Sequence, residues 1–400
     1  MVKLTAKFSF MELKKIHISD IGKVVTGKTP RTSIVENYGG DIPFLTPSDD
    51  LSYKSVPKTG KTLTEQGLNE VKNCLLPPHS VCVSCIGTDL GKVVMTSEPT
   101  ITNQQFNSII PNRRFDADFV YYLMTLVGKE LNYLSKTSTA VPIINKSSFS
   151  NYEVEVPDLE TQEKIASILS SLDSKIELNR RINDNLEQQA QALFKAWFVD
   201  FEPFGGVMPD DWRMGTLSEI CGYSKDKIDI DNLTLDSYYS TENMHPNRQG
   251  AVQATTLPTI KQTTACKKGD VLISNIRPYF KKILYCFSDC GCSTDVLCFV
   301  PNKTDYSAFL YCALYADKFF DYMVAGSKGT KMPRDDKQQI MVYPICIPSA
   351  EYIEKFNQAV ASMLETVYTN RIEENNLANL RDTLLPKLMN GEIDVSAVKI

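Results

Sequence analysis

Two long stretches of the chain carry apolar side chains at alternating intervals of four and three positions. The repeating positions hold Ile165, Leu169, Leu172, Ile176, Asn179, Asn183, Leu186, Ala190, Leu193 and Trp197 in the first stretch, and Phe356, Val360, Met363, Val367, Asn370, Glu374, Leu377, Arg381, Leu384 and Leu388 in the second. A hydrophobic period sustained at 3.5 residues is typical of helices that pack as a coiled coil. Pro157 and Pro348 stand just before the two stretches, where a helix tolerates proline. The pattern predicts two helices, each about 60 Å long.

An apolar stripe of this length needs a partner, and the simplest arrangement pairs the two helices with each other as an antiparallel coiled coil. The residues expected at this helix–helix contact are Ile165, Leu169, Leu172, Ile176, Asn179, Leu186, Phe356, Met363, Val367, Asn370, Leu377 and Leu384. Asn179 and Asn370 would form a polar layer that fixes the register at some loss of stability. In the alternative arrangement, each helix is independent and packs on its own globular domain.

The remainder of the chain alternates short apolar runs with turn residues. The runs are "SVCVSCI", "KVVMT", "NSIIP" and "VEVP" before the first long helix, and "DVLISNI", "KKILYCF", "VLCFVP" and "MVYPICIP" before the second. Runs rich in β-branched and aromatic residues between turn residues predict strands. Short helices are expected at residues 117–133 and 306–323. The predicted fold class is α+β, with twisted, mixed or mostly antiparallel sheets in two domains.

The chain repeats itself at an offset of 190 to 191 residues. The stretch from Pro157 matches the stretch from Pro348, with identical pairs such as Asn179/Asn370. The strand-rich segments that precede the helices match more faintly at nearly the same offset. Four hundred residues also exceed what one hydrophobic core usually holds. The order is therefore globular, helical, globular, helical, with expected boundaries at residues 1–157, 158–201, 202–347 and 348–400.

The charge of the chain is unevenly distributed. The net charge is −5, and residues 158–201 and 348–400 each hold 5 Lys and Arg against 8 Asp and Glu, whereas residues 1–157 hold 17 against 15. Since electrostatic steering depends on local patches, this acidity does not exclude nucleic acid as a partner. The sequence has no apolar run long enough to span a membrane and no secretory signal pattern. It predicts a cytoplasmic protein without a membrane partner.

The cysteines and histidines give no sign of a metal centre. Eleven scattered cysteines in a reducing compartment are most simply free and mostly buried thiols. Cys286, Cys290, Cys292 and Cys298 follow the spacing C-x3-C-x-C-x5-C, which fits no common zinc pattern. The three histidines of the chain show neither metal-ligand spacing nor a nucleophile–base arrangement. We expect no metal and no catalytic residues on this chain.

The stretch "GKVVTGKT" from Gly22 matches the nucleotide-binding pattern G-x-x-x-x-G-K-[ST]. A phosphate loop needs a buried strand before it and a helix that opens at its lysine, here Lys28. The preceding "MELKKIHISDI" is charged, and Pro30 and a double glycine follow soon after. These residues disfavour a helix, so we interpret the match as accidental. A nucleotide-hydrolysing enzyme is the less favoured alternative.

Recognition of DNA is the function that the remaining polar residues favour. Residues 261–282 contain six Lys and Arg against the single acid Asp270, which suits phosphate contacts. Asparagine and glutamine in the predicted loops suit hydrogen bonds to base edges, although any one of them could be an ordinary surface side chain or a structural turn residue. The full set of candidate DNA contacts is Lys28, Arg31, Ser48, Tyr53, Lys54, Ser84, Lys92, Asn103, Gln104, Gln105, Asn243, Asn247, Arg248, Asn275, Arg277, Tyr279, Lys281, Lys282, Lys328, Lys331 and Arg334.

The chain as a whole resembles the specificity subunits of type I restriction-modification systems. The segments that carry this resemblance are "VTGKTPRTS", "YGGDIPFLTPSD", "TNQQFNSIIP", "STAVPIINKSSFSNYEVEVP" and "QEKIASILSSLDSKIELNRRINDNLEQQAQALFKAWFVDF". In that family G-x-T-P is a turn and not a nucleotide loop. The second globular segment departs from this opening, because its "ICGYSKDKIDI" contains no G-x-T-P.

The resemblance implies a non-catalytic subunit with two target recognition domains, each reading one half of a split double-stranded DNA sequence. The long helices would act as a spacer and dock two adenine methyltransferase subunits, which recruit restriction and translocase subunits. S-adenosylmethionine, ATP and Mg²⁺ would be bound by those partners, with no cofactor on this chain. The alternative is a coiled-coil adaptor that joins two proteins without touching nucleic acid; the acidic helices fit it, whereas the basic, amide-rich loops do not.

Overall fold

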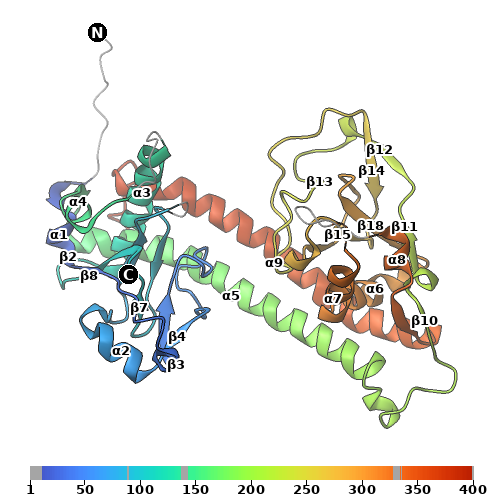
Figure 1. Ribbon diagram of the computed structural model, residues 1–400. Coiled ribbons are helices and arrows are strands. Elements are labelled where there is room, and N and C mark those ends of the chain that lie inside the picture. Colours follow the sequence, from blue (N-terminus) through green and yellow to red (C-terminus); the bar gives the residue numbers. More distant parts are fainter. Residues whose placement is uncertain (1–10, 88–89, 137–142, 328–333, 335, 399–400) are drawn as a thin grey trace. The chain divides into compact units, whose positions relative to one another are not determined.

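A computed structural model of the chain describes residues 11–87, 90–136, 143–327, 334 and 336–398. The chain divides into two compact units, of which unit 1 comprises Met1–Leu178 and Glu373–Ile400, and unit 2 comprises Asn179–Ile372. Each unit combines one globular segment with part of each long helix (Figure 1). The boundary between the two units thus lies within the two long helices, whereas the sequence predicts domain boundaries at the ends of these helices.

Unit 1 is built on two small sheets and a ribbon. The larger sheet is antiparallel with the order β2-β8-β5-β6, formed by β2 (Gly22–Thr26), β8 (Phe106–Pro111), β5 (Val81–Ser84) and β6 (Val93–Met95). The smaller sheet contains β4 (Thr62–Leu63), β3 (Tyr38–Leu45) and β7 (Ile101–Thr102), with β7 parallel to β3. The ribbon pairs β1 (Lys14–His17) with β9 (Glu153–Val156). The helices are α1 (Ile18–Ile21), α2 (Glu65–Val71), α3 (Ala117–Lys136) and α4 (Lys146–Ser150).

Strand β5 shows why its sequence reads as a continuous apolar run. Val81 and Val83 face the core that includes α3, whereas Cys82 faces a second core on the other side of the sheet. All four residues of the strand are buried. A strand covered on both faces loses the alternation of apolar and polar residues that a half-exposed strand shows.

Unit 2 repeats this architecture. Its antiparallel sheet has the order β11-β18-β15-β16, formed by β11 (Cys221–Tyr223), β18 (Val296–Pro301), β15 (Val271–Ser274) and β16 (Ile283–Tyr285). A mixed sheet contains β12 (Lys227–Asp229), β14 (Gln262–Cys266), β17 (Cys290–Cys292) and β13 (Tyr238–Tyr239), and the ribbon pairs β10 (Arg213–Thr216) with β19 (Pro344–Ile347). The helices are α6 (Ser307–Tyr315), α7 (Asp317–Gly326) and α8 (Lys337–Met341).

The helix expected at residues 306–323 is broken in two. Ala316 adopts an extended conformation between α6 and α7. The break is stabilised from outside, because Arg248 Nε donates to the Tyr315 carbonyl at 2.9 Å and Arg248 Nη2 donates to Asp317 Oδ1 at 2.5 Å. A long-range contact of this kind overrides the local helical pattern and is invisible in the sequence.

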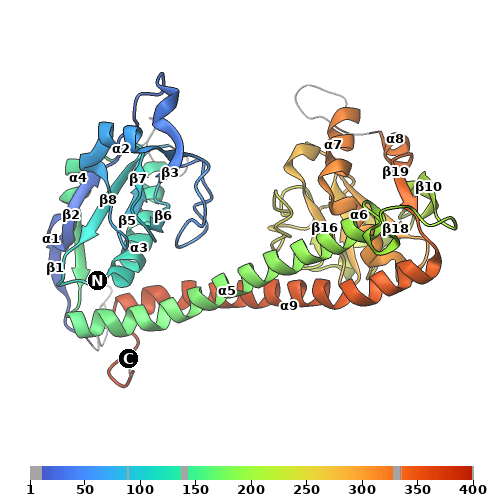
Figure 2. The ribbon, with the colours of Figure 1, turned by 90° about the horizontal axis from the view of Figure 1, so that it is seen from below.

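The long helices α5 (Leu159–Phe198) and α9 (Ala350–Met389) are present as predicted. Within unit 1 their segments lie side by side, joined by Asp173–Arg381 and Lys175–Glu373 ion pairs of 2.6 and 3.2 Å. Within unit 2, the Asn370 amide donates to Asn183 Oδ1 at 2.8 Å, and farther along α5 Trp197 contacts Tyr352. The residue numbers rise along α5 as they fall along α9, so the helices are antiparallel (Figure 2).

The apolar seam of the helices is also part of the domain cores. In unit 1, Ile165, Leu169 and Leu385 share a core with Phe119 of α3. In unit 2, Phe194, Phe198, Phe356 and Val360 share a core with Phe309 of α6. The two arrangements considered from the sequence are therefore combined, because each helix packs on its partner and on a globular domain.

The polar layer differs from the expected one. Asn179 is fully buried, but the amide that pairs with Asn370 across the helices of unit 2 is Asn183. Among the described helices, none combines the length and apolar character needed to cross a membrane.

Candidate nucleic-acid interface

The segment "GKVVTGKT" does not form a strand–loop–helix. Strand β2 ends at Thr26, and the next element along the chain is η1 (Val35–Asn37), one turn of 3-10 helix. A Cβ on Gly27 would lie 2.1 Å from the Asn103 carbonyl oxygen, so only glycine permits this close approach. The Lys28 amide donates to the Thr102 carbonyl at 2.9 Å. The segment is a turn that packs on the end of β7.

The facing segment "TNQQF" is itself a hydrogen-bonded turn. Asn103 Nδ2 donates to Gln105 Oε1 at 2.9 Å, and Asn103 Oδ1 accepts from the Gln105 amide at 3.1 Å. Thr29 donates its hydroxyl hydrogen to Gln104 Oε1 at 2.6 Å. The two motifs that carry the family resemblance at the start and middle of unit 1 therefore support each other's shape.

Four candidate DNA contacts are buried in the structure rather than exposed on its surface. Ser84, Asn103, Asn243 and Asn275 lie inside the domains. Asn243 Nδ2 donates to the carbonyls of Tyr238 and Val252, both at 2.9 Å. A side-chain amide of this kind forms hydrogen bonds with backbone groups of a loop that have no backbone partner. The presence of an asparagine in the sequence cannot distinguish this structural role from recognition of a base.

Lys54 is another correction, because its ammonium group points into unit 1. Its Nζ lies 2.5 Å from Asp118 Oδ1 and 3.2 Å from the Ser170 hydroxyl, and it stands over the Tyr122 ring at 4.9 Å from the centroid. The Lys54 side chain is only 18% exposed. This lysine ties its loop to α3 and α5.

Three candidates in unit 2 also bind the protein itself. Lys281 Nζ and Arg248 Nη2 donate to Asp317 Oδ1 at 2.6 and 2.5 Å, and Lys282 Nζ donates to the Thr241 carbonyl at 2.5 Å. The hydrogen bonds from Lys281 and Arg248 lower the pKa of Asp317 to about 2. These three cations hold two loops and α7 together, so their contribution to a binding surface is indirect.

Arg31 is exposed, but it forms hydrogen bonds and an ion pair with Glu70. Its Nε and Nη2 donate to Glu70 Oε1 at 3.0 and 2.7 Å, and its backbone amide donates to Glu70 Oε2 at 3.0 Å. The side-chain hydrogen bond from Arg31 is the main reason why the pKa of Glu70 falls from 4.5 to about 2. A charge-assisted pair of this geometry is well ordered for a surface contact.

This pair predicts a specific pH dependence. Since the pKa of Glu70 is lower in the folded state, the pair stabilises the fold above pH 4.5, and the contribution is lost as the pH falls toward 2. We expect a carboxyl carbon NMR titration of Glu70 to show a midpoint near 2. In Arg31→Gln the midpoint should rise only part of the way to 4.5, because the backbone amide bond remains. An ordinary midpoint in the wild type would contradict the pairing.

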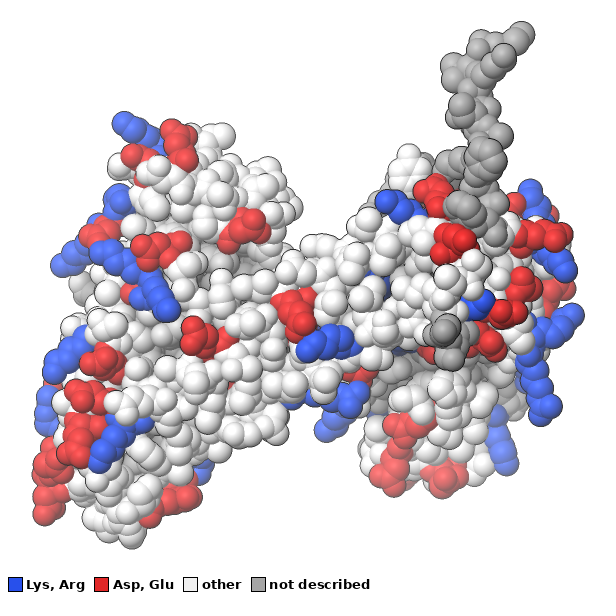
Figure 3. Space-filling view, turned by 180° about the vertical axis from the view of Figure 1, so that it is seen from behind, with Lys and Arg blue, Asp and Glu red and all other residues white. Residues whose placement is uncertain are grey.

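The candidates that remain on the surface are fewer. Lys28, Ser48, Lys92, Gln104, Asn247, Tyr279 and Arg334 are exposed, whereas Tyr53, Gln105 and Arg277 are half-buried. Arg334 pairs with Asp295 at 2.9 Å. Lys328 and Lys331 lie outside the described residues. On the face shown in Figure 3, basic and acidic side chains are interspersed, and no continuous basic surface is visible.

Two features of the candidate surface in unit 2 were missed in the sequence. Phe280, beside Tyr279, is an exposed aromatic residue, and Asp317 is the acceptor that gathers two cations. The run "RPYFKK" holds adjacent aromatic residues between cations and could have drawn attention to Phe280. The position of Asp317 depends on the helix break and has no signal in the sequence.

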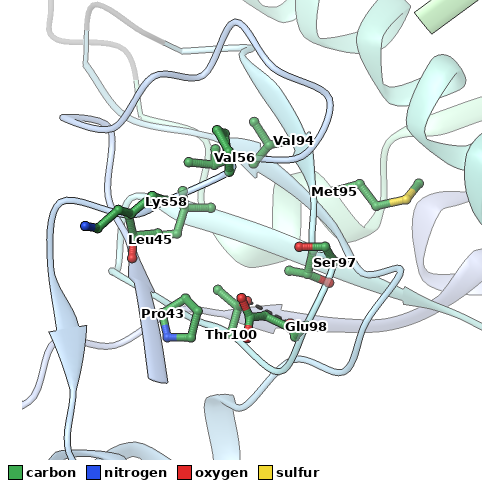
Figure 4. Close-up of a pocket in the computed structure, with 12 residues that line it drawn as sticks. Pro43, Leu45, Val56, Lys58, Val94, Met95, Ser97, Glu98 and Thr100 are labelled. Carbon is green, nitrogen blue, oxygen red and sulfur yellow. Dashed lines mark hydrogen bonds between the residues drawn. The ribbon is translucent and has the colours of Figure 1, made fainter. Parts of the chain in front are cut away.

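Two hollows of unit 1 differ in size and lining. Figure 4 shows one lined by Pro43, Leu45, Val56, Lys58, Val94, Met95, Ser97, Glu98 and Thr100. Its volume of about 40 Å³ is far below that of typical small-molecule sites. A wider groove of about 570 Å³ is lined in part by Tyr122 and Arg381, which both bind Asp173. Two of the polar side chains of that groove are thus engaged with a buried carboxylate.

The cysteines are free and, except for the half-buried Cys74, buried. Cys286, Cys290, Cys292 and Cys298 gather with Cys266 in one core of unit 2, although their spacing alone does not indicate it. Within the described part of the chain, no three His, Cys, Asp or Glu side chains are arranged to hold a metal ion.

Comparisons with known proteins all point to the same protein family. A family model described as "Type I restriction modification DNA specificity domain" matches residues 11–188 and 209–381. The chain is 28% identical to the type I restriction enzyme MjaIX specificity subunit of Methanocaldococcus jannaschii, over 96% of this chain and 94% of that protein. It is 37% identical to the HindI specificity subunit of Haemophilus influenzae, over 42% of this chain and 38% of that one.

A solved structure, the S subunit of a type I restriction-modification system from M. genitalium, superposes with a TM-score of 0.56. The alignment covers 97% of this chain and 98% of that chain at 17% sequence identity. At this identity the likeness concerns the fold.

Proposed function

Because the chain belongs to the type I restriction modification DNA specificity family, we propose that it recognises a DNA sequence in two separated parts, one for each globular segment. The observation that carries this proposal is the duplication itself. Units 1 and 2 share the strand orders β2-β8-β5-β6 and β11-β18-β15-β16, while their loops differ in sequence. Two domains that share a scaffold but differ in their loops are suited to recognise two different base sequences on one duplex.

The remaining parts of the system are assigned to partners in this proposal. Two adenine methyltransferase subunits would dock on the paired helices, and restriction and translocase subunits would join them. S-adenosylmethionine, ATP and Mg²⁺ would be bound by those subunits, and this chain would contribute no catalytic group. The helices would set the number of unread base pairs between the two parts of the target. A coiled-coil adaptor without nucleic-acid binding is not favoured, because the relatives are DNA specificity subunits.

Mapping of methylated adenines tests the proposal directly. The chain is expressed with its methyltransferase subunit in a host that lacks other adenine methylation, and the modified sites are sequenced. We expect a two-part motif with a fixed gap. A matched chain in which residues 202–347 are exchanged for those of a relative should change one part of the motif and keep the other. A continuous motif, or methylation without sequence preference, would contradict the proposal.

A further inference from the structure

The turn between β15 and β16 has an unusual backbone. Arg277 and Lys281 have φ angles of +52° and +50°, on either side of the 3-10 turn Pro278–Phe280. Residues other than glycine rarely adopt this left-handed region, and strain of this kind concentrates at functional sites. The backbone conformation therefore marks the turn as a place where particular side chains are needed.

The corresponding positions of the sister domain also have positive φ angles but carry different residues. At an offset of 190, Arg277 and Lys281 correspond to Gly87 and Gly91, whose φ angles are +88° and +89°. Glycine is the unstrained choice at such positions. Unit 2 instead places two long cationic side chains at these positions, so the positive φ is common to both domains and the cations are particular to unit 2.

A second strained turn locks the first in place. The amides of Asn247 and Arg248 donate to the carbonyls of Phe280 and Lys281 at 2.8 and 3.0 Å. Asn247 and Arg248 also have positive φ angles, +55° and +65°. Together with the Lys281–Asp317 ion pair, these bonds fix the backbone of the turn. A rigid turn loses little entropy when its side chains bind a partner.

The turn presents two aromatic rings to solvent. Tyr279 is 49% exposed and Phe280 is 37% exposed, and their ring centroids are 4.7 Å apart at an interplanar angle of 52°. Beside them, Arg277 Nε is buried without a hydrogen-bond partner among the described residues. This buried nitrogen is not itself a surface donor, but the Arg277 side chain as a whole is half-buried, and an arginine cation next to exposed rings fits a partner that offers both planar apolar surface and anionic oxygen atoms.

Nucleic acid offers both. We propose that Tyr279 and Phe280 form an aromatic wedge that partly unstacks one base step in the half-site read by unit 2, while Arg277 donates to an adjacent phosphate. Apolar side chains that enter between base pairs kink duplex DNA, and aromatic rings stack on bases of any sequence. This inference rests on the proposed function, and it adds a DNA deformation that the function itself does not require.

The test uses the full chain in complex with its methyltransferase subunit and a duplex that carries the mapped target. 2-Aminopurine, whose fluorescence rises on unstacking, replaces the purines of the unit 2 half-site one at a time. With the wild-type complex we expect a several-fold rise at one step. Tyr279→Ala combined with Phe280→Ala should abolish the rise, and each ring should account for about a 5- to 150-fold loss of affinity.

Arg277→Gly separates the cation from the shape of the turn. Since glycine adopts a positive φ without strain, as Gly87 does at the corresponding position of unit 1, the variant should fold with an unchanged or higher thermal midpoint. The slope of log affinity against log salt concentration should fall by about one in magnitude, as expected for one lost phosphate contact. Tyr133→Ala, which removes a 71% exposed tyrosine of α3 in unit 1, is the matched control and should leave both measurements unchanged.

The outcomes separate the wedge from the function. A folded wedge variant that retains the fluorescence rise and wild-type affinity overturns the wedge, while a gapped methylation motif would still support the function. Loss of methyltransferase association without any change in fluorescence would assign the two rings to a protein contact and also overturns the wedge. A wild-type complex that binds DNA without sequence preference overturns both.

Discussion

Replacement of Asp173 by leucine should lower the free energy of unfolding by about 3–5 kcal/mol. The Asp173 carboxylate is buried in unit 1, accepts from Arg381 Nη1 at 2.6 Å, and accepts from the Tyr122 hydroxyl at 2.5 Å. Burial of a charge is tolerated only when it is paired, and removal of Asp173 leaves the half-buried Arg381 with its bonds to the exposed Asp382 alone and the Tyr122 hydroxyl without this acceptor. Chemical denaturation followed by circular dichroism, with amide hydrogen exchange in α3, measures the loss.

The duplication provides the matched control. At the offset of 191, Asp173 and Arg381 correspond to Leu364 and Ala190 of unit 2, which are both buried in an apolar core. Asp173→Leu combined with Arg381→Ala copies this solution into unit 1. Replacement of a buried ion pair by a well-packed apolar pair often leaves the stability of a protein unchanged. We therefore expect the double variant to recover most of the free energy of unfolding that Asp173→Leu loses. A double variant as unstable as the single one would show that the stranded charge is not the cause.

The same pair shows how far a 3.5-residue period predicts a helix contact. The pattern identified both helices and their partnership, but it placed Leu172, Met363 and Leu384 in the seam. All three are half-buried, whereas the residues that follow each of them, Asp173, Leu364 and Leu385, are buried. A helix that packs on a partner and on a domain core buries a wider stripe than a coiled-coil seam, so the strict period selects one edge of it.

The loops were less predictable, because the residue types of a loop do not reveal which side chains face solvent and which face the domain core. Lys28 and Lys54 are both lysines of predicted loops in unit 1, yet the first is exposed and the second is half-buried against Tyr122. Which of them faces solvent depends on Asp118 and Ser170, which lie far along the chain. The accidental phosphate-loop match was recognised because that decision needed only local context, namely the absence of a helix-forming sequence after Lys28.

Phe356→Ala should lower the free energy of unfolding of unit 2 by about 3–5 kcal/mol. Phe356 is fully buried, and its ring centroid lies 5.1 Å from that of Phe198 and 5.9 Å from that of Phe194. Truncation removes apolar surface and leaves a cavity, which surrounding aromatic rings cannot close without leaving their contacts. The measurement is intrinsic fluorescence during denaturation, because the two tryptophans of the chain, Trp197 and Trp212, both belong to unit 2.

Phe149→Ala is the matched control, since it removes the same side chain from a fully buried site in unit 1. Helices α5 and α9 contribute residues to both units, so the control also measures how far unfolding is shared. If each unit unfolds on its own core, Phe149→Ala lowers the stability seen by hydrogen exchange in α3 and leaves the tryptophan transition in place. An equal shift of that transition in both variants would contradict the expectation for unit 2 alone, because the continuous helices would then couple the cores into one cooperative transition.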